Sequence, residues 1–256
     1  MSTAAAKKSE AFDSREYWEK TDEELVEELL SLDLPEEDGE PLEDVWHRVQ
    51  INFLIDMVKT EKGKKEDYFV GGNMFVYYSL QQVKNRDYKG PDFFYVEGAR
   101  IDPNRGKWVA WVEDGKYPDV IIELLSPSTK KEDLGRKKKI YEKIFKTGEY
   151  FCFDHDENKL YGWKLTGSGY EEISPDEDGR MESKVLGYKL GSWRGTYLDE
   201  DLYLRFFYPS GEIVFTQAEE EKARAEAEKA RAEAEKARAD RLEKELEELK
   251  TKMASS

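Results

Sequence analysis

The run from Val120 to Leu125, with the sequence VIIELL, constrains the fold more than any other part of the chain. Short apolar runs rich in β-branched residues are typical of strands that are buried on both faces. Glu123 places a single charge in the middle of this run. A buried carboxylate costs several kcal/mol or more unless it is paired, hydrogen-bonded or bound to a metal. The sequence therefore predicts that Glu123 has a compensating partner.

A helix is expected soon after this strand. Thr129-x-x-Glu132 fits a capping box, which predicts that the helix begins near Lys130. Helical spacing then places one set of residues on a core-facing stripe: Asp133, Lys137, Ile140, Tyr141 and Ile144. Lys137 is the lysine of this stripe, and the intervening chain is short enough for it to meet Glu123 above the end of the strand.

The rest of the pattern has the order helix, several strands, helix and further strands, which predicts an α/β domain on a mixed sheet. An acidic helix is expected over 16–32, after a small and polar stretch at 1–11, followed by a loop at 34–39 and a second helix over 43–60. Strands are expected over 69–78 (one strand across a Gly-Gly pair), 93–96, 149–154, 160–165 and 170–173, with short strands within 185–208. His47 and Gln50 lie near the apolar stripe of the second helix, where a satisfied polar group at the core edge is favoured over a catalytic role.

The C-terminal segment has a different character. The heptapeptide EKARAEA occurs at 221–227 and again at 228–234, and leucine and methionine then follow with a/d spacing at 242, 246, 249 and 253. This composition and repeat predict a long helix or a coiled coil. The alanine part is a weak seam, so association of two copies through this tail and a lone charged helix are both compatible with the sequence.

The charge and the cysteine content limit the possible substrates and the cellular location of the protein. The chain has 256 residues and a formal net charge of −16, but residues 1–44 alone hold 16 acids and 4 bases. The remaining domain is close to neutral, so the overall acidity excludes non-specific coating of DNA without excluding a nucleic-acid substrate. Cys152 is the one cysteine, and no signal peptide or membrane-spanning run is visible. These features predict a cytoplasmic location with no membrane partner.

Asp92, Glu123 and Lys137 are the candidate catalytic residues. Two carboxylates at strand ends suit Mg²⁺, which accepts a few carboxylates together with water and substrate phosphate. A bound metal lowers the pKa of its water and stabilises a leaving oxygen. A nearby lysine can orient that water or neutralise charge that develops on the phosphate. The three residues are therefore interpreted as a site for phosphodiester hydrolysis, and a buried structural ion pair is the alternative for Glu123 and Lys137.

Two neighbouring features have simpler interpretations. Asp119 lies four residues before Glu123 on the same strand, about 13 Å away, so the two cannot share one metal. A cap at the strand entry is the expected role of Asp119. The lysines between 130 and 146 fit a solvated helix face and contact with substrate phosphates equally well.

These residues carry a resemblance to a known family. Pro91-Asp92 and Asp119-Val-Ile-Ile-Glu123 resemble the motif of the PD-(D/E)xK nuclease superfamily, although Leu125 stands where that motif usually has its lysine. Within the superfamily, the blocks PDVIIELLSPST, DLGRK and GEYFCFD resemble the Uma-two family of restriction-endonuclease-like proteins, which is abundant in cyanobacteria. That family places an equivalent lysine on the following helix, four residues after an aspartate, and Asp133 and Lys137 match this pattern. The resemblance covers about residues 43–208, and charged heptad tails are frequent in the family.

The resemblance implies a restriction-endonuclease-like α/β domain at 43–216, with an acidic arm at 1–42 and a charged heptad-repeat helix or coiled coil at 217–256. It implies an endodeoxyribonuclease that uses Mg²⁺ or Mn²⁺ to cut DNA. Asp92 and Glu123 would bind the metal, and Lys137 would assist the attacking water. The alternative is a catalytically inactive nuclease fold that serves as an interaction module and self-associates through its tail.

Overall fold

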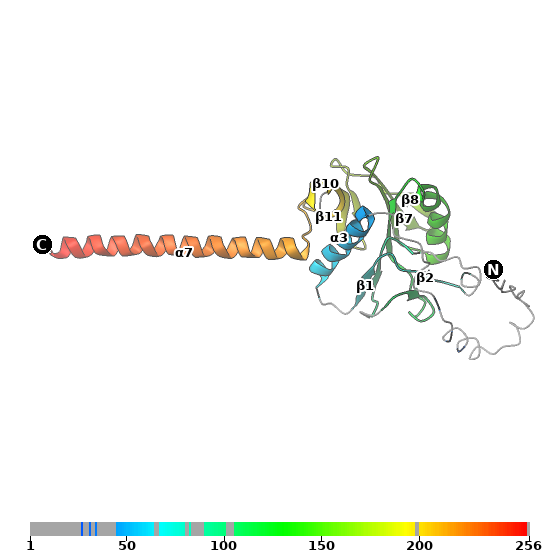
Figure 1. Cartoon of the computed structure of the whole chain (residues 1–256), viewed down its shortest axis with the longest axis horizontal. Coiled ribbons are helices and arrows are strands. Elements are labelled where there is room, and N and C mark those ends of the chain that lie inside the picture. The colour runs from blue at the N-terminus through cyan, green and yellow to red at the C-terminus, as the bar shows by residue number, and fades with distance from the viewer. Residues whose placement is uncertain are drawn as a thin grey trace, which may run out of the picture.

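The computed structural model describes residues 45–63, 67–79, 90–100, 105–197 and 200–254, together with the single positions Glu27, Ser31, Leu34 and Gln82. The acidic arm, with the helix expected over 16–32 and the loop over 34–39, falls almost wholly outside these residues. Figure 1 shows an α/β domain from which one long C-terminal helix projects. The predicted architecture, a mixed sheet flanked by helices and followed by a charged helix, is confirmed.

A six-stranded mixed sheet forms the centre of the domain, in the order β1-β3-β5-β6-β7-β8. The central pair β5 and β6 is parallel, and the other neighbours are antiparallel. A three-stranded sheet has the order β11-β10-β9, and β2 pairs with β4. The strands are β1 (Tyr68–Gly71), β2 (Val76–Tyr77), β3 (Phe93–Glu97), β4 (Trp108–Val109), β5 (Val120–Leu125), β6 (Glu149–Asp154), β7 (Lys159–Thr166), β8 (Gly169–Glu172), β9 (Met181–Ser183), β10 (Tyr188–Tyr197) and β11 (Glu200–Phe207).

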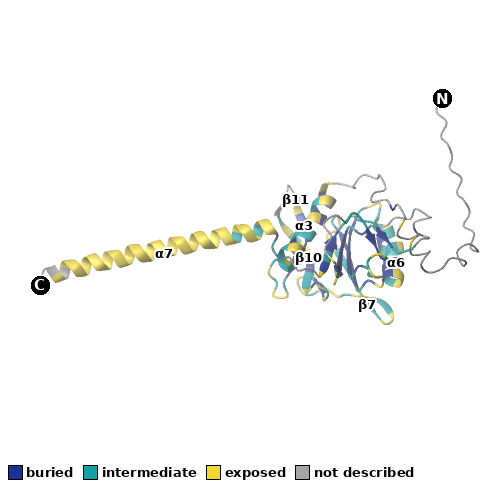
Figure 2. Ribbon diagram, turned by 90° about the horizontal axis from the view of Figure 1, so that it is seen from below, coloured by how far each residue is buried: buried dark blue, intermediate teal, exposed yellow. Residues whose placement is uncertain are grey.

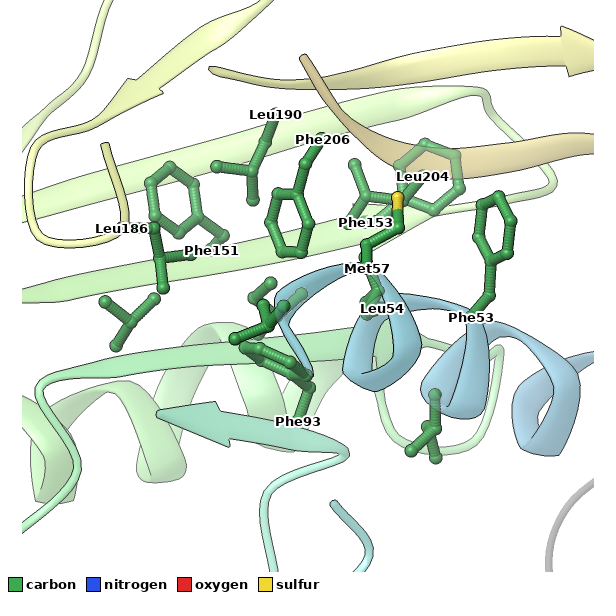
Figure 3. Close-up of a cluster of buried hydrophobic side chains, with 14 of the residues drawn as sticks. Phe53, Leu54, Met57, Phe93, Phe151, Phe153, Leu186, Leu190, Leu204 and Phe206 are labelled. Carbon is green, nitrogen blue, oxygen red and sulfur yellow. The ribbon is translucent and has the colours of Figure 1, made fainter. Parts of the chain in front are cut away.

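Both faces of the central sheet are covered. Helix α3 (Val45–Lys62) and the three-stranded sheet cover one face, and a helical segment at 130–145 covers the other. Side chains alternate along β5, so Ile122 and Leu124 face α3 whereas Ile121 and Leu125 face the helical segment. This double burial explains why VIIELL is almost wholly apolar. Figure 3 shows the layer on the α3 side, formed by Phe53, Leu54, Met57, Phe93, Phe151, Phe153, Leu186, Leu190, Leu204 and Phe206.

The single strand expected over 69–78 is wrong. The chain forms β1 and β2 in different sheets, with Gly72 and Asn73 between them. Asn73 has a φ of 48°, which no extended strand allows. Gly72 lies so close to the neighbouring strand that a Cβ there would be 2.1 Å from the carbonyl oxygen of Asp92. The turn is therefore fixed by a close backbone approach that the apolar pattern did not reveal.

The helical segment begins at Lys130, as predicted, but the expected capping box does not form. Thr129 has helical backbone angles and its side chain makes no cap hydrogen bond. The Lys130 N–H instead donates to the carbonyl oxygen of Ser126 at 2.9 Å. The segment consists of α5 (Lys130–Glu132), η1 (Asp133–Lys137), α6 (Lys138–Ile140) and η2 (Tyr141–Phe145), where η denotes a wide π-helical turn.

The π turns change which side chains face the core. Ile144, expected on the buried stripe, is 45% exposed, whereas Phe145 is 3% exposed. A π turn places one more residue in the turn than an α turn does. The regular helical spacing therefore slips by one position in η2, and Phe145 takes the buried place predicted for Ile144.

The C-terminal segment forms one helix, α7 (Gln217–Ala254), which is exposed along almost all of its length (Figure 2). Its start is fixed by a capping box. The Glu219 N–H donates to Thr216 Oγ1 at 3.3 Å, and the Thr216 N–H donates to Glu219 Oε2 at 2.9 Å. Glu219 also pairs with the fully buried Arg205, so the first turn of α7 is part of the domain. None of the described helices has the length and apolar character needed to cross a membrane.

Candidate active site

Strand pairing brings Asp92 and Glu123 together. Phe93 is opposite Ile122 in the antiparallel pair β3–β5, so the residue before β3 stands opposite Glu123. The Asp92 N–H donates to Glu123 Oε2 at 3.2 Å, and the Leu124 N–H donates to Asp92 Oδ2 at 2.7 Å. The two acidic residues predicted from the sequence are therefore direct neighbours across two strands.

The turn between β1 and β2 holds Asp92 from the other side. The Asn73 N–H donates to the carbonyl oxygens of Pro91 and Asp92 at 2.9 and 3.2 Å. Because Gly72 has no side chain, its backbone can press against the Asp92 carbonyl. The position of Asp92 is thus fixed by backbone contacts, which suits a side chain that must be aimed accurately.

Glu123 receives two further hydrogen bonds from the helical segment. Lys137 Nζ lies 3.0 Å from Glu123 Oε1, and the Tyr141 hydroxyl donates to the same oxygen at 2.7 Å. The contact between Lys137 and Glu123 expected from chain geometry is confirmed. Lys137 Nζ also lies 2.8 Å from Asp133 Oδ1, and the Tyr150 hydroxyl donates to the Asp133 carbonyl at 2.9 Å.

The cluster is shielded from water. The side chains of Glu123 and Asp133 are 0% and 1% exposed, and that of Lys137 is 13% exposed. Lys137 belongs to η1 and Tyr141 opens η2, so both side chains that reach Glu123 lie on π-helical turns. Such turns occur frequently at functional sites.

Burial and crowding of like charges shift the pKa values of the cluster. Burial, with repulsion from Asp133 and Asp92, raises the pKa of Glu123 to about 8 despite the opposing effect of Lys137. Burial also raises the pKa of Asp92, although Lys137 and the Leu124 N–H act in the opposite direction. Burial alone would lower the pKa of Lys137, but the surrounding carboxylates outweigh it and raise that pKa, so the lysine is a permanent cation. The cluster therefore has more acidic groups than its one cation can neutralise.

The acidic surplus fits a divalent cation. Asp92 and Glu123 offer the hard oxygen ligands that Mg²⁺ and Mn²⁺ prefer, and a second cation would favour ionisation of the groups whose pKa is raised. The described residues contain no cluster of three or more His, Cys, Asp or Glu side chains arranged to enclose a metal. Two carboxylates completed by water and substrate phosphate are a usual Mg²⁺ arrangement, so this donor set suits a metal that arrives with its substrate.

Asp133 and Tyr141 were not among the predicted site residues. Both had been placed on the core-facing stripe with Lys137, and the four-residue spacing from Asp133 to Lys137 was part of the family pattern. Asp133 could have been found from the sequence, because a buried lysine needs more than one acceptor. Tyr141 could not be assigned in this way, because a tyrosine on an apolar stripe is most often a core residue.

Other polar residues near the site have structural roles. Asp119 Oδ2 accepts a hydrogen bond from the Glu97 N–H at 2.8 Å, which confirms its role as a cap at the strand entry. Gln50 is fully buried and bonds both backbone groups of Leu204, as expected of a satisfied core residue. The Nζ atom of Lys138 lies over the ring of Trp163, 3.6 Å from its centroid.

Leu125 occupies the position of the usual motif lysine. Its side chain is 5% exposed and packs in the core beneath the helical segment. Glu123 and Leu125 point to the same face of β5, and Lys137 approaches that face from the helical segment. The lysine that contacts Glu123 is therefore Lys137 on the helical segment, and not a residue at position 125 on the strand.

The family model Uma2, described as "Putative restriction endonuclease", matches residues 37–194. A solved structure of "a putative nuclease belonging to DUF820 from Anabaena variabilis ATCC 29413" is 16% identical, with a TM-score of 0.42, and the match covers 63% of this chain and 89% of that one. No curated protein sequence matches the chain.

Proposed function

The chain belongs to the Uma2 family of restriction-endonuclease-like proteins, and from this premise we propose that it is a metal-dependent endonuclease that hydrolyses DNA phosphodiester bonds. The observation that carries the proposal is the contact of Lys137 with Glu123, beside Asp92, on an inner strand of the central sheet. A buried group of three acids around one lysine is costly for stability, which favours a functional reason for its presence.

In this proposal Asp92 and Glu123 hold Mg²⁺ or Mn²⁺. When bound, the metal would supply Lewis-acid stabilisation of charge on the phosphate and a water of lowered pKa. Lys137 remains charged and therefore acts as a cation that neutralises charge on the phosphate, not as a proton acceptor. Asp133 fixes the Lys137 ammonium, and Tyr141 fixes the Glu123 carboxylate.

We also place this activity in the cytoplasm, which suits a chain whose single cysteine, Cys152, is a buried free thiol. Self-association through α7 belongs to the same proposal. Four large apolar side chains of the helix are more than half exposed and follow a/d spacing: Leu242, Leu246, Leu249 and Met253.

The test is cleavage of supercoiled plasmid by the purified protein with Mg²⁺ or Mn²⁺. Glu123→Gln should abolish cleavage, and Lys137→Ala should lower its rate by about 10²–10³-fold, the usual cost of removing one group that stabilises transition-state charge. Lys139→Ala is the matched control, because Lys139 is exposed on the same segment and should not matter. Cleavage by Lys137→Ala at the wild-type rate would end the assignment of Lys137. Absence of any cleavage by wild-type protein would favour the inactive interaction module.

A further inference from the structure

Both histidines of the chain line a single pocket of about 400 Å³. His47 belongs to the first turn of α3, and His155 directly follows β6. They are 108 positions apart in sequence, and neither belongs to the proposed catalytic set. The pocket is also lined by Trp46 of α3 and by Ser126 and Pro127 of the turn after β5.

The parallel pair β5–β6 builds one wall of this pocket. Leu125 stands beside Asp154 in the strand register, so the next residues, Ser126 and His155, leave the sheet side by side. The carboxyl ends of parallel strands are a common place for ligands in open α/β sheets. The pocket therefore lies where this topology brings loop residues together.

The walls of the pocket are aromatic. The ring centroid of Trp46 lies 4.5 Å from that of His155, with the planes tilted by 47°, and 5.2 Å from that of His47, edge to face. His155 Nε2 is buried and has no hydrogen-bond partner within the described part of the chain. The pocket thus combines flat rings with a buried imidazole nitrogen whose hydrogen bond is not supplied by the described residues.

The pocket adjoins the carboxylate pair through one backbone unit. His47 Nε2 lies 3.0 Å from the Leu124 carbonyl oxygen, and the Leu124 N–H donates to Asp92. A positive charge on His47 would act to lower the pKa of the Asp92 carboxyl. The pocket and the carboxylate pair are therefore linked through the backbone of Leu124.

We propose that this pocket binds one nucleobase of the substrate strand, turned out of its stack beside the phosphate that is cut. This inference rests on the proposed nuclease function and names how the same site holds its substrate. Flat walls of Trp and His accept any base by stacking, and imidazole nitrogens can bond to a base edge. The volume is in the usual range for small-ligand pockets.

Other ligands fit the pocket less well. A phosphate would meet Asp156 in the pocket lining and the acidic cluster behind Leu124, which repel a second anion. A metal is also disfavoured, because His47, His155 and Asp156 are not placed to hold one: the described residues contain no group of three or more His, Cys, Asp or Glu side chains that could bind an ion. Because unstacking is least costly for unpaired or mismatched bases, the pocket favours single-stranded or distorted positions in the substrate.

The two histidines supply a direct readout that is independent of cleavage. The full chain has only two imidazole rings, and both line the pocket, so the imidazole signals in ¹H–¹⁵N spectra all report on it. Titration with deoxyadenosine or thymidine should shift the signals of both rings, whereas inorganic phosphate should shift neither. Unmoved resonances with both nucleosides at millimolar concentration would overturn the proposal, as would shifts caused by phosphate and not by nucleosides.

Variants at His155 separate stacking from packing. His155→Ala should weaken binding of a single-stranded oligonucleotide, measured by fluorescence anisotropy in EDTA, by at least about fivefold, the effect of losing one stacked base. His155→Phe keeps the ring and should retain most of that affinity, with a thermal melt matching the wild type. Equal affinity of wild type and His155→Ala would contradict the proposal. Nucleoside-dependent shifts in a protein that cuts no plasmid would refute the nuclease function and leave the pocket in place.

Discussion

The domain junction and the candidate active site each bury charged side chains, but the balance of charge differs between them. At the domain junction Arg205 is fully buried, pairs with one carboxylate, that of Glu219, and lies over the rings of Phe53 and Trp193. At the candidate active site Lys137 is surrounded by three acids, and the pKa values of Glu123 and Asp92 are raised. One cation is matched by one carboxylate in the first region, whereas acids are in excess in the second.

This difference distinguishes a buried charge with a structural role, at the junction, from buried charges with a functional role, at the candidate site. At the junction the two charges cancel, so removal of the carboxylate would leave Arg205 buried without a counter-charge. An excess of acid is stable only if protons or cations enter from solution. Removal of a carboxylate should therefore destabilise the junction and stabilise the candidate site.

The largest effect on stability is expected at the junction. Glu219→Ala should lower the free energy of unfolding by about 3–5 kcal/mol, because arginine cannot lose its proton and would be left buried and unpaired. Urea denaturation followed by circular dichroism measures this loss. Glu220→Ala, an exposed neighbour on α7, should change stability by less than about 0.5 kcal/mol. Equal losses in the two variants would show that Arg205 does not depend on Glu219.

At the candidate site, removal of a carboxylate should instead stabilise the folded protein, and only at high pH. The pKa of Glu123 rises from 4.5 to about 8 on folding, so the folded state holds more protons between these values. Stability of the wild type should therefore fall as pH increases from about 4.5 to 8. Glu123→Gln should flatten this slope and stabilise the metal-free protein at pH 9 by an amount on the order of 1–3 kcal/mol. Urea unfolding at pH 5 and 9 tests this. If Glu123→Gln is less stable than the wild type at pH 9, the buried charges would have a structural role in both regions.

The smallest effect is expected from the free part of α7. Deletion of 225–254 keeps Glu219 and should change the free energy of unfolding by less than about 0.5 kcal/mol. Deletion from 218 onward should instead reproduce the loss seen in Glu219→Ala, because it removes the partner of Arg205. If α7 pairs two copies, the shorter deletion should also reduce the sedimentation coefficient to that of a monomer. A large loss of stability in the shorter deletion would place further contacts of α7 on the domain.

Much of this arrangement follows from sequence. A lone acid in VIIELL predicted a buried strand and a missing partner, and the helical stripe predicted that Lys137 supplies it. The pairing of Asp92 with Glu123 was also accessible, because two strand-end acids suggested a shared site. Each of these inferences depends on a local pattern that the final packing preserves.

The remaining features depend on contacts between distant segments. The Thr-x-x-Glu pattern occurs at Thr129 and at Thr216, yet only the second forms a capping box, with Arg205 holding its glutamate. The break between β1 and β2 at Gly72 results from the close approach of its backbone to Asp92. The burial of Phe145 in the place predicted for Ile144 results from the π turns. The pocket shared by His47 and His155 depends on the β5–β6 register, which no local pattern encodes.

The 38 residues of α7 also set a length scale. At 1.5 Å per residue the helix is about 57 Å long, which equals about 17 base pairs of B-form DNA. Its apolar stripe lies near the far end, so the orientation of a helix pair decides the separation of the two domains. A parallel pair would place both domains at one end, within reach of a single short duplex. An antiparallel pair would hold them at opposite ends of a rod, so that, if the proposed endonuclease function holds, two cuts would fall on distant stretches of DNA or on different molecules.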